Sequence, residues 1–193
     1  MTTNQLLSTL QSNIHALVET VETEFMPLPD AALNTKEAPD RWSILECLEH
    51  LNRYSRYYNT ALAKAIARAK TQNQARDEQA RSTWLGQKFI AMVHPSNVKK
   101  QKTFKSMNPA QSVLDRSVVD EWMHHQEQRL ELLKEARSIN LNQSHVPIEF
   151  FKWLRLNVGD TFQLLVAHEQ RHLLQALRVK ARVEPVFAPA LKV

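Results

Sequence analysis

The sequence predicts an all-α protein, a four-helix bundle folded as a single domain over residues 1–193. The chain has 193 residues, of which 43% are hydrophobic and 23% charged, and this composition is typical of one globular domain. Only Gly86 and Gly159 are glycines. Because tight turns and phosphate-binding loops usually need glycine, this count disfavours a β-rich fold, a P-loop and a dinucleotide-binding fold.

The first two helices are indicated by apolar periodicity and by recognisable ends. Apolar residues at three- and four-residue steps predict a helix over about residues 4–25, which Pro27 and Pro29 terminate. Ser43 and Glu46 form an S-x-x-E capping pattern, which predicts a second helix that continues to Lys70 or beyond.

The long stretch over residues 71–107 is less regular, with a short helical piece predicted between Trp84 and Val93. A connection of this length in a compact domain is usually functional or structured. We therefore expect the second and third helices not to form a simple tight hairpin.

The last two helices also have end signals. Asn108 followed by Pro109 predicts the start of the third helix, which is expected to stop at Asn140. A fourth helix is predicted from about residue 157 to just before Pro185, and Asp160 favours its N-terminal end electrostatically. No strand is predicted.

Cysteine content and hydropathy predict a cytoplasmic protein. Cys47 is the only cysteine, so the chain cannot form an internal disulfide. The first residues do not have the pattern of a signal peptide, and no apolar run approaches the length of about 18 residues needed to cross a bilayer. We expect no membrane association.

Positive charge is concentrated in residues 53–105, which hold 12 Lys or Arg residues and 2 Asp or Glu residues. Lys99, Lys100, Lys102 and Lys105 lie close to Phe104, as in proteins that bind single-stranded nucleic acid. This segment supports one hypothesis, a non-enzymatic module that binds nucleic acid or another polyanion. A solvated surface without a partner is the simpler alternative.

The motif HEQRH at residues 168–172 points to metal chemistry. On a helix, His168 and His172 project from one face one turn apart, which suits two coordination positions of a metal. The alternative is a pair of histidines hydrogen-bonded at the surface. A zinc protease is disfavoured, because Gln175 and Arg178 occupy the positions that glycine and histidine take in one class of these enzymes, and no strand is predicted to hold a peptide.

A third ligand must come from upstream of this motif. His50 is the best candidate, since it lies beside the apolar stripe of the second predicted helix, and His124 and His125 compete with it. Those two are adjacent and point about 100° apart, so at most one of them faces inward. Glu169 is a candidate catalytic proton acceptor, with a surface ion pair to a Lys or Arg one turn away as the alternative.

Two stretches resemble the DinB/YfiT-like superfamily: RWSILECLEHL at residues 41–51 and VAHEQRHLLQALRV at residues 166–179. The family pattern is a tryptophan-serine entry to the second helix, a histidine about eight residues later, and H-x-x-x-H in the last core helix. It falls on Trp42, Ser43, His50, His168 and His172.

This resemblance implies a bundle with up-down-down-up connectivity, usually in a homodimer. It also implies a divalent metal, zinc or nickel, bound by His50, His168 and His172. Some relatives resemble low-molecular-weight-thiol S-transferases, and others metal-dependent hydrolases. The expected function is therefore one of these reactions on a small molecule, and the polyanion-binding module is the alternative.

Overall fold

In a computed structural model of the chain, residues 1–72, 74–110 and 112–187 are described. The protein is mostly helical, and the helices are α1 (Thr3–Glu24), α2 (Asp30–Asn34), α3 (Ile44–Thr71), α4 (Trp84–Val93), α5 (Ser117–Ala136) and α6 (Val158–Phe187), with a 3-10 turn η1 (Lys105–Met107). A small antiparallel sheet consists of β1 (His145–Ile148) and β2 (Phe151–Asn157). The single-domain prediction runs to Val193, and its last six residues, 188–193, lie outside the described ranges.

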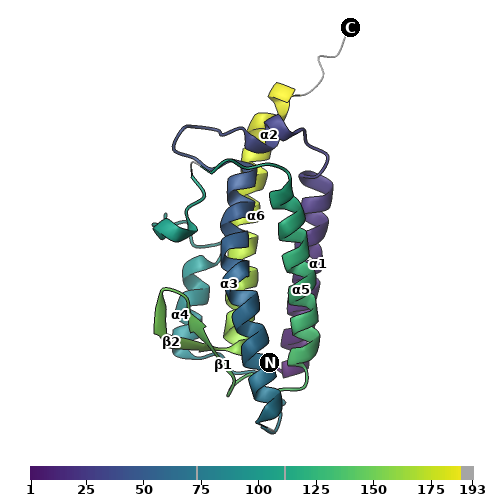
Figure 1. Cartoon of the computed structure of the whole chain (residues 1–193), viewed down its shortest axis with the longest axis vertical. Coiled ribbons are helices and arrows are strands. Elements are labelled where there is room, and N and C mark those ends of the chain that lie inside the picture. Colours follow the sequence, from purple (N-terminus) through teal and green to yellow (C-terminus); the bar gives the residue numbers. More distant parts are fainter. Residues whose placement is uncertain (73, 111, 188–193) are drawn as a thin grey trace.

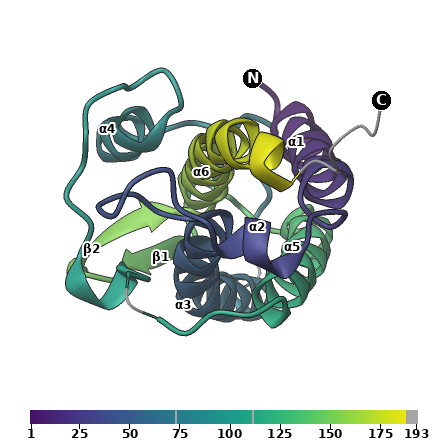
Figure 2. The same ribbon diagram turned by 90° about the horizontal axis from the view of Figure 1, so that it is seen from above.

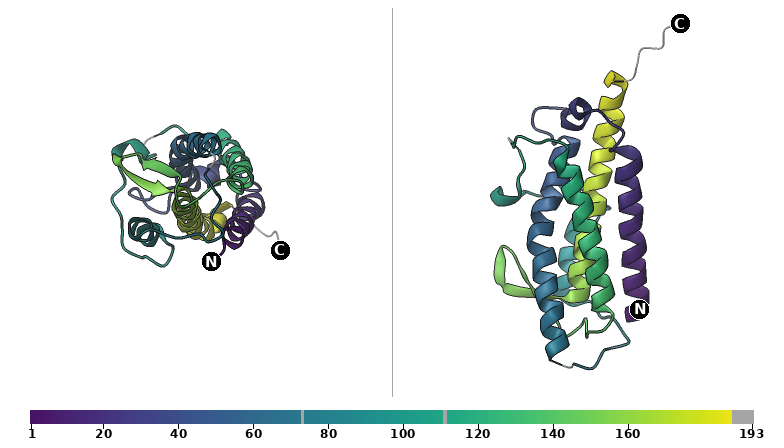
Figure 3. Two further views of the ribbon diagram at one scale, coloured as in Figure 1. Left: turned by 90° about the horizontal axis from the view of Figure 1, so that it is seen from below. Right: turned by 45° about the vertical axis from the view of Figure 1, so that its right-hand side comes forward.

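The long helices α1, α3, α5 and α6 lie side by side around one apolar core (Figures 1 and 3). Seen along the helices, each of the four occupies one corner (Figure 2). Each contributes fully buried side chains, among them Ile14, Leu48, Trp122 and Phe162. The short helix α4 and the β1–β2 hairpin lie outside this group, beside α3 and α6 (Figure 2).

The predicted starts of two core helices are confirmed by their capping contacts. The Glu46 amide donates to Ser43 Oγ over 3.1 Å, while Glu46 Oε2 accepts from the Ser43 amide over 2.9 Å. At the start of α6, the Asp160 amide donates to Asn157 Oδ1 over 2.6 Å. These local contacts satisfy amides that have no partner within a helix.

The third predicted helix starts later than expected. Pro109 begins a turn, in which the Ser112 amide donates to the Pro109 carbonyl and the Ala110 amide donates to Asn108 Oδ1. Helix α5 begins only at Ser117, whose amide donates to Asp115 Oδ1 over 2.9 Å. The asparagine-proline pair therefore caps a turn instead of a helix, because the same side-chain chemistry serves both structures.

The other ends also differ from expectation. Helix α5 ends at Ala136, before Asn140, and the short α2 was not predicted. Helix α6 ends at Phe187, although its end was predicted before Pro185. A proline this close to a C-terminal end removes only one backbone donor from the last turn.

The β1–β2 hairpin corrects the prediction of an all-α chain without strands. Its ladder pairs Val146 with Leu156, and a register shift follows Pro147. Val146, Ile148 and Leu156 are buried, and Ile148 and Leu156 form a second apolar cluster with Leu164 of α6. The segment forms strands because alternate apolar residues can be buried against α6, and its irregular register closes the turn without glycine.

Helix α4 matches the predicted range, and a polar contact holds it against α6. The Thr83 amide and hydroxyl both donate to Asp160 Oδ2, over 2.9 and 2.8 Å. A Cβ atom at Gly86 would lie only 2.0 Å from that oxygen. Glycine at this position therefore lets the helix approach the Asp160 carboxylate.

Within the described ranges, no helix combines the length and apolarity needed to cross a membrane.

Candidate metal centre

Three histidines from two core helices converge inside the protein. His50 lies on α3, two turns after the cap at Ser43, and is 2% exposed. His168 and His172 lie one turn apart on α6 and are 8% and 9% exposed. One potential ligand atom of each ring lies within 4.8 Å of those of the other two. Neither His124 nor His125 belongs to this group.

The closest nitrogens have a separation that suits one metal ion. His50 Nε2 and His168 Nε2 lie 3.2 Å apart. Two nitrogens bound to zinc at about 2.0–2.1 Å, at a tetrahedral angle, are separated by about 3.3 Å. The ring centroids lie 4.5 Å apart for His50 and His172 and 4.7 Å apart for His168 and His172. The donor set therefore fits a divalent metal that prefers imidazole ligands.

Hydrogen bonds set the orientation of two of these rings. His50 Nδ1 lies 2.7 Å from the Met107 carbonyl oxygen, which can only accept, so this nitrogen carries the proton. In the neutral ring, His50 Nε2 is then the nitrogen with the free lone pair. His172 Nδ1 similarly lies 3.2 Å from Gln175 Oε1. Metal-binding histidines usually make such a contact with their second nitrogen.

Burial keeps the imidazoles in the neutral form that binds metals. It lowers the pKa of His50 from 6.5 to about 4, partly opposed by the Met107 hydrogen bond and assisted by the Arg53 charge. The pKa values of His168 and His172 are also held well below their ordinary value, chiefly by burial and then by the neighbouring imidazoles. At neutral pH all three rings can therefore act as ligands without first losing a proton.

Two aromatic side chains enclose the histidines. The Trp42 ring centroid lies 4.7 Å from that of His50 and 5.7 Å from that of His172. Tyr54 lies 5.0 Å from His50 and 4.7 Å from His168, and burial raises the pKa of its hydroxyl to about 12. These rings shield the imidazoles from water and restrict their rotation.

The long connection between α4 and α5 passes over the centre and is fastened there by two arginines. Arg53 Nη1 donates to the carbonyls of Ser106 and Asn108, over 3.2 and 2.8 Å. Arg171, next to His172, donates to the carbonyls of His94, Asn97 and Lys99. Together with the Met107 carbonyl on His50, these contacts make the connection part of the centre. Sequence reasoning missed the contact between His50 and Met107, because a backbone carbonyl that accepts a hydrogen bond leaves no sequence pattern.

Glu169 lies beside His168 in sequence, but its carboxylate contacts α5. Oε1 accepts from Gln126 Nε2 over 2.9 Å and from Arg129 Nη1. Arg129 is fully buried, and its Nη2 also donates to Ser55 and Asn59 of α3. Glu169 therefore forms a buried ion pair with Arg129 and not the surface ion pair considered from the sequence. Arg129 was not singled out from the sequence, although it lies three residues after Gln126 on the buried side of α5.

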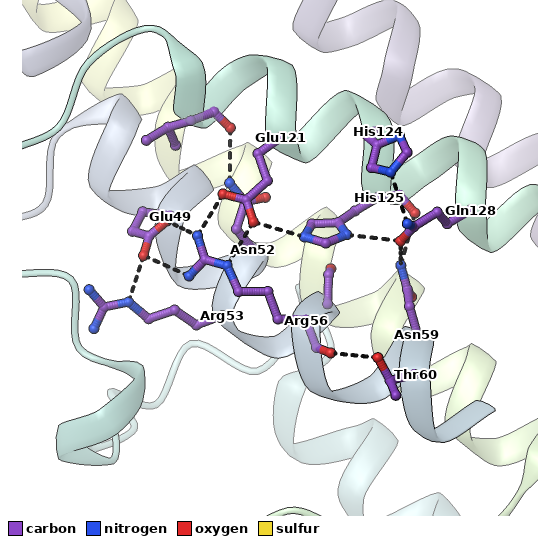
Figure 4. Close-up of polar contacts among 12 residues, drawn as sticks. Glu49, Asn52, Arg53, Arg56, Asn59, Thr60, Glu121, His124, His125 and Gln128 are labelled. Atoms are coloured by element: carbon purple, nitrogen blue, oxygen red, sulfur yellow. Dashed lines mark hydrogen bonds and ion pairs between the residues drawn. The ribbon is translucent and has the colours of Figure 1, made fainter. Parts of the chain in front are cut away.

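The competing histidines have other contacts. His125 is 7% exposed, and its ring lies 3.2 Å from both Glu121 Oε1 and Gln128 Oε1. Figure 4 shows it in a polar cluster between α3 and α5, in which Glu49 and Glu121 both contact Arg56. His124 is exposed at the same place. Cys47 is buried in the apolar core, and burial raises the pKa of its thiol.

Part of the predicted basic segment is paired with acidic groups. Arg53 and Arg56 contact Glu49, and Lys70 contacts Glu135. The lysines at positions 99, 100, 102 and 105 are exposed. Phe104 stacks on Phe150 with ring centroids 3.8 Å apart, which occupies one face of the ring proposed to contact bases. Binding of nucleic acid by this segment stays a prediction.

A known family model matches most of the chain. The model of the DinB superfamily matches residues 7–176, a range that includes all three histidines and parts of all four long helices. No curated protein and no solved structure matches the chain significantly.

Proposed function

The chain belongs to the DinB superfamily, and we propose that His50, His168 and His172 bind one divalent metal ion, zinc or nickel. The observation that carries this proposal is the convergence of three buried imidazoles whose ligand atoms lie within 4.8 Å of one another. The Met107 carbonyl supports it, because it holds the proton of His50 on the nitrogen that faces away from His168.

We further propose that the protein is a metal-dependent hydrolase or a low-molecular-weight-thiol S-transferase. A metal held by three neutral imidazoles keeps at least one coordination position open and supplies Lewis acidity there. The low exposure of the three histidines, between 2% and 9%, favours a small molecule as substrate over a protein chain. Trp42 and Tyr54 would exclude water and orient the ligand rings.

Glu169 is the residue predicted to accept a proton, and that role stays a proposal. Its Oε1 already accepts from Arg129 and Gln126, so proton transfer to this oxygen would disturb a buried ion pair. These contacts favour a second role, in which Glu169 fixes the rotation of α6 and thereby the direction of His168 and His172. The second role is tested by a variant that lacks both Arg129 and Glu169, because loss of a positioning pair should change the metal affinity of the histidines.

We also propose the connectivity of the bundle, the oligomeric state and the location of the protein. The connection between α3 and α5 is long and passes through α4, so these two neighbouring helices can run parallel. Up-down-down-up connectivity in a four-helix bundle requires parallel second and third helices. A homodimer is proposed from the family resemblance, and a cytoplasmic location from the single cysteine, Cys47, which is a buried free thiol.

Elemental analysis of the purified full chain tests the metal site. We expect about one zinc or nickel ion per chain, because the three imidazoles converge on one point and can share one ion. His50→Gln and His168→Gln should each reduce the content strongly. His124→Gln, which removes an exposed imidazole outside the group, is the matched control and should keep the ion. A wild-type chain that stays metal-free after incubation with both ions would refute the proposal.

Activity is tested separately, on protein loaded with the metal that it retains. The screen combines low-molecular-weight thiols with small electrophiles, and in a second arm uses small esters and amides. Turnover in either arm that is lost in His168→Gln and kept in His124→Gln assigns the reaction class. Turnover equal in both variants assigns it to a contaminant instead.

A further inference from the structure

A small cavity separates the last turns of α3 from the base of the β1–β2 hairpin, at the end of the molecule where the N-terminus lies (Figure 1). Its volume is about 130 Å³, enough for several water molecules or one small polyatomic ion. The polar side chains that line it are those of Arg68, Gln72, Gln143, Ser144, His145 and Arg155. None of the three metal-site histidines lines it.

The fold brings these residues together from three segments. Arg68 and Gln72 are four residues apart near the end of α3, so they share one face of the helix. In the hairpin, Arg155 pairs with Pro147 and His145 pairs with Asn157. His145 and Arg155 are therefore diagonal neighbours on the same face of the ladder. His145 Nδ1 lies 2.8 Å from the Gln143 carbonyl oxygen, which fixes the imidazole at the cavity.

The cavity is lined by positive charge without a compensating acid. No aspartate or glutamate lines it. In the part of the chain that the structure describes, the guanidinium groups of Arg68 and Arg155 have neither a hydrogen bond nor an ion pair. Two like charges that border one small space repel each other, and an anion between them would remove that repulsion.

A buried hydroxyl lies in the same wall. Ser144 is 6% exposed, and its Oγ has no hydrogen-bond partner among the described residues. The C-terminal end of α3 disfavours an anion through the helix dipole, although the Gln72 amide donates to the carbonyls of Arg68 and Ala69. The two full positive charges of Arg68 and Arg155 outweigh this partial negative charge. The donors that the lining residues offer to a ligand are the guanidinium groups of Arg68 and Arg155 and the side-chain amides of Gln72 and Gln143.

We propose that this cavity binds a phosphate-sized oxyanion through Arg68 and Arg155. Guanidinium groups present a planar fork of N–H donors that matches phosphate oxygens. The same chemistry serves inorganic phosphate and the terminal phosphate of a small monoester. Because the cavity shares no residue with the three histidines, this site is independent of the proposed metal function.

Isothermal titration calorimetry on the full chain tests the site. The protein is first treated with a chelator, which is then removed, so that phosphate cannot bind to a metal. We expect saturable binding of inorganic phosphate at about one ion per chain. Arg68→Gln and Arg155→Gln should each weaken it by about tenfold or more, since each removes a charge-assisted contact. Both residues are exposed, so neither change should unfold the protein.

Lys64→Gln is the matched control, because it removes a positive charge from the same helix one turn before Arg68 without touching the cavity wall. It should leave the affinity unchanged. Phenyl phosphate forms a second arm: tighter binding than inorganic phosphate identifies a monoester as the ligand, and weaker binding identifies the free ion. Absence of saturable binding in both arms, or an equal loss in all three variants, overturns the proposal.

Discussion

Arg129 and Glu169 form an ion pair in the interior of the protein, next to the histidines of the candidate metal centre. Arg129 is fully buried and Glu169 is 2% exposed. The arginine reaches Ser55 and Asn59 on α3, while the glutamate lies between His168 and His172 on α6. The pair therefore joins α3, α5 and α6 next to the candidate metal centre, whose histidines come from α3 and α6.

Breaking this pair should cost more than replacing it. Arg129→Met leaves a carboxylate buried without its cation, and we expect a loss of about 3–5 kcal/mol in the free energy of unfolding. The double variant Arg129→Met/Glu169→Met removes both charges and should lie much closer to the wild type. Urea denaturation measures all three proteins. A single variant as stable as the double one would contradict a structural role for the pair.

Metal affinity separates positioning by this pair from simple stabilisation. If the pair fixes the direction of the α6 histidines, the double variant should fold and yet bind Co²⁺ more weakly, with a changed absorption spectrum for the bound ion. An unchanged spectrum and affinity would show that the histidines are oriented without it. A matched control is Lys134→Met/Glu131→Met, which removes an exposed ion pair from the same helix α5.

The metal-free protein should lose stability as the pH falls from about 6.5 to about 4. Burial lowers the pKa of His50 from 6.5 to about 4, so in this window the unfolded chain binds a proton that the folded chain does not. The contribution is present in full above pH 6.5 and is lost toward pH 4, and it amounts to roughly 3 kcal/mol for His50. Urea denaturation at a series of pH values measures it.

His50→Gln provides the comparison for this pH dependence. Its curve should be flatter than that of the wild type, because one of the titrating groups is gone. A residual slope should remain, since the pKa values of His168 and His172 are lowered too. Identical slopes in the two proteins would mean that His50 does not titrate as its burial requires.

The two glycines should respond oppositely to alanine. In Gly86→Ala the new methyl group meets Asp160 Oδ2 at 2.0 Å, so α4 must move away or the carboxylate must give up its contacts with Thr83. We expect a loss of about 1–3 kcal/mol in the free energy of unfolding. In Gly159→Ala the nearest atoms lie 3.5 Å away, which is ordinary contact.

Thermal unfolding of both variants checks this expectation. Gly159→Ala should be neutral, or stabilising by up to about 1 kcal/mol because alanine favours a helix. If the two variants behave alike, the close approach of α4 to Asp160 is not a requirement of the fold.

Arg171 should control the mobility of the connection over the metal centre. Arg171→Gln removes donors to three backbone carbonyls between His94 and Lys99, so amides in this segment should exchange their hydrogens faster. Arg178→Gln, an exposed change two turns later on the same helix, is the control. Hydrogen exchange followed by mass spectrometry measures both. Equal exchange in the two variants would show that other contacts hold the segment.

Much of the helical structure could be predicted from the sequence because its signals are local. The capping pair of Ser43 and Glu46, the range of α4 and the contact of Asn157 with the start of α6 each depend on neighbours within one turn. The i, i+4 spacing of His168 and His172 likewise guaranteed that both rings share one face of any helix. These features follow from short-range geometry, whatever the rest of the chain does.

Tertiary packing decided the remainder. From the sequence, His50 was only the best of three candidates for the third ligand, because sequence spacing says nothing about distances between helices. The packing of α3 against α6 brings His50 to the other two histidines. The Met107 carbonyl, the Arg129 partner of Glu169 and the hairpin at residues 145–157 all depend on contacts between distant segments. Local capping contacts fixed where α3 and α6 begin, whereas burial against other elements decides which distant side chains meet. The candidate centre depends on this packing.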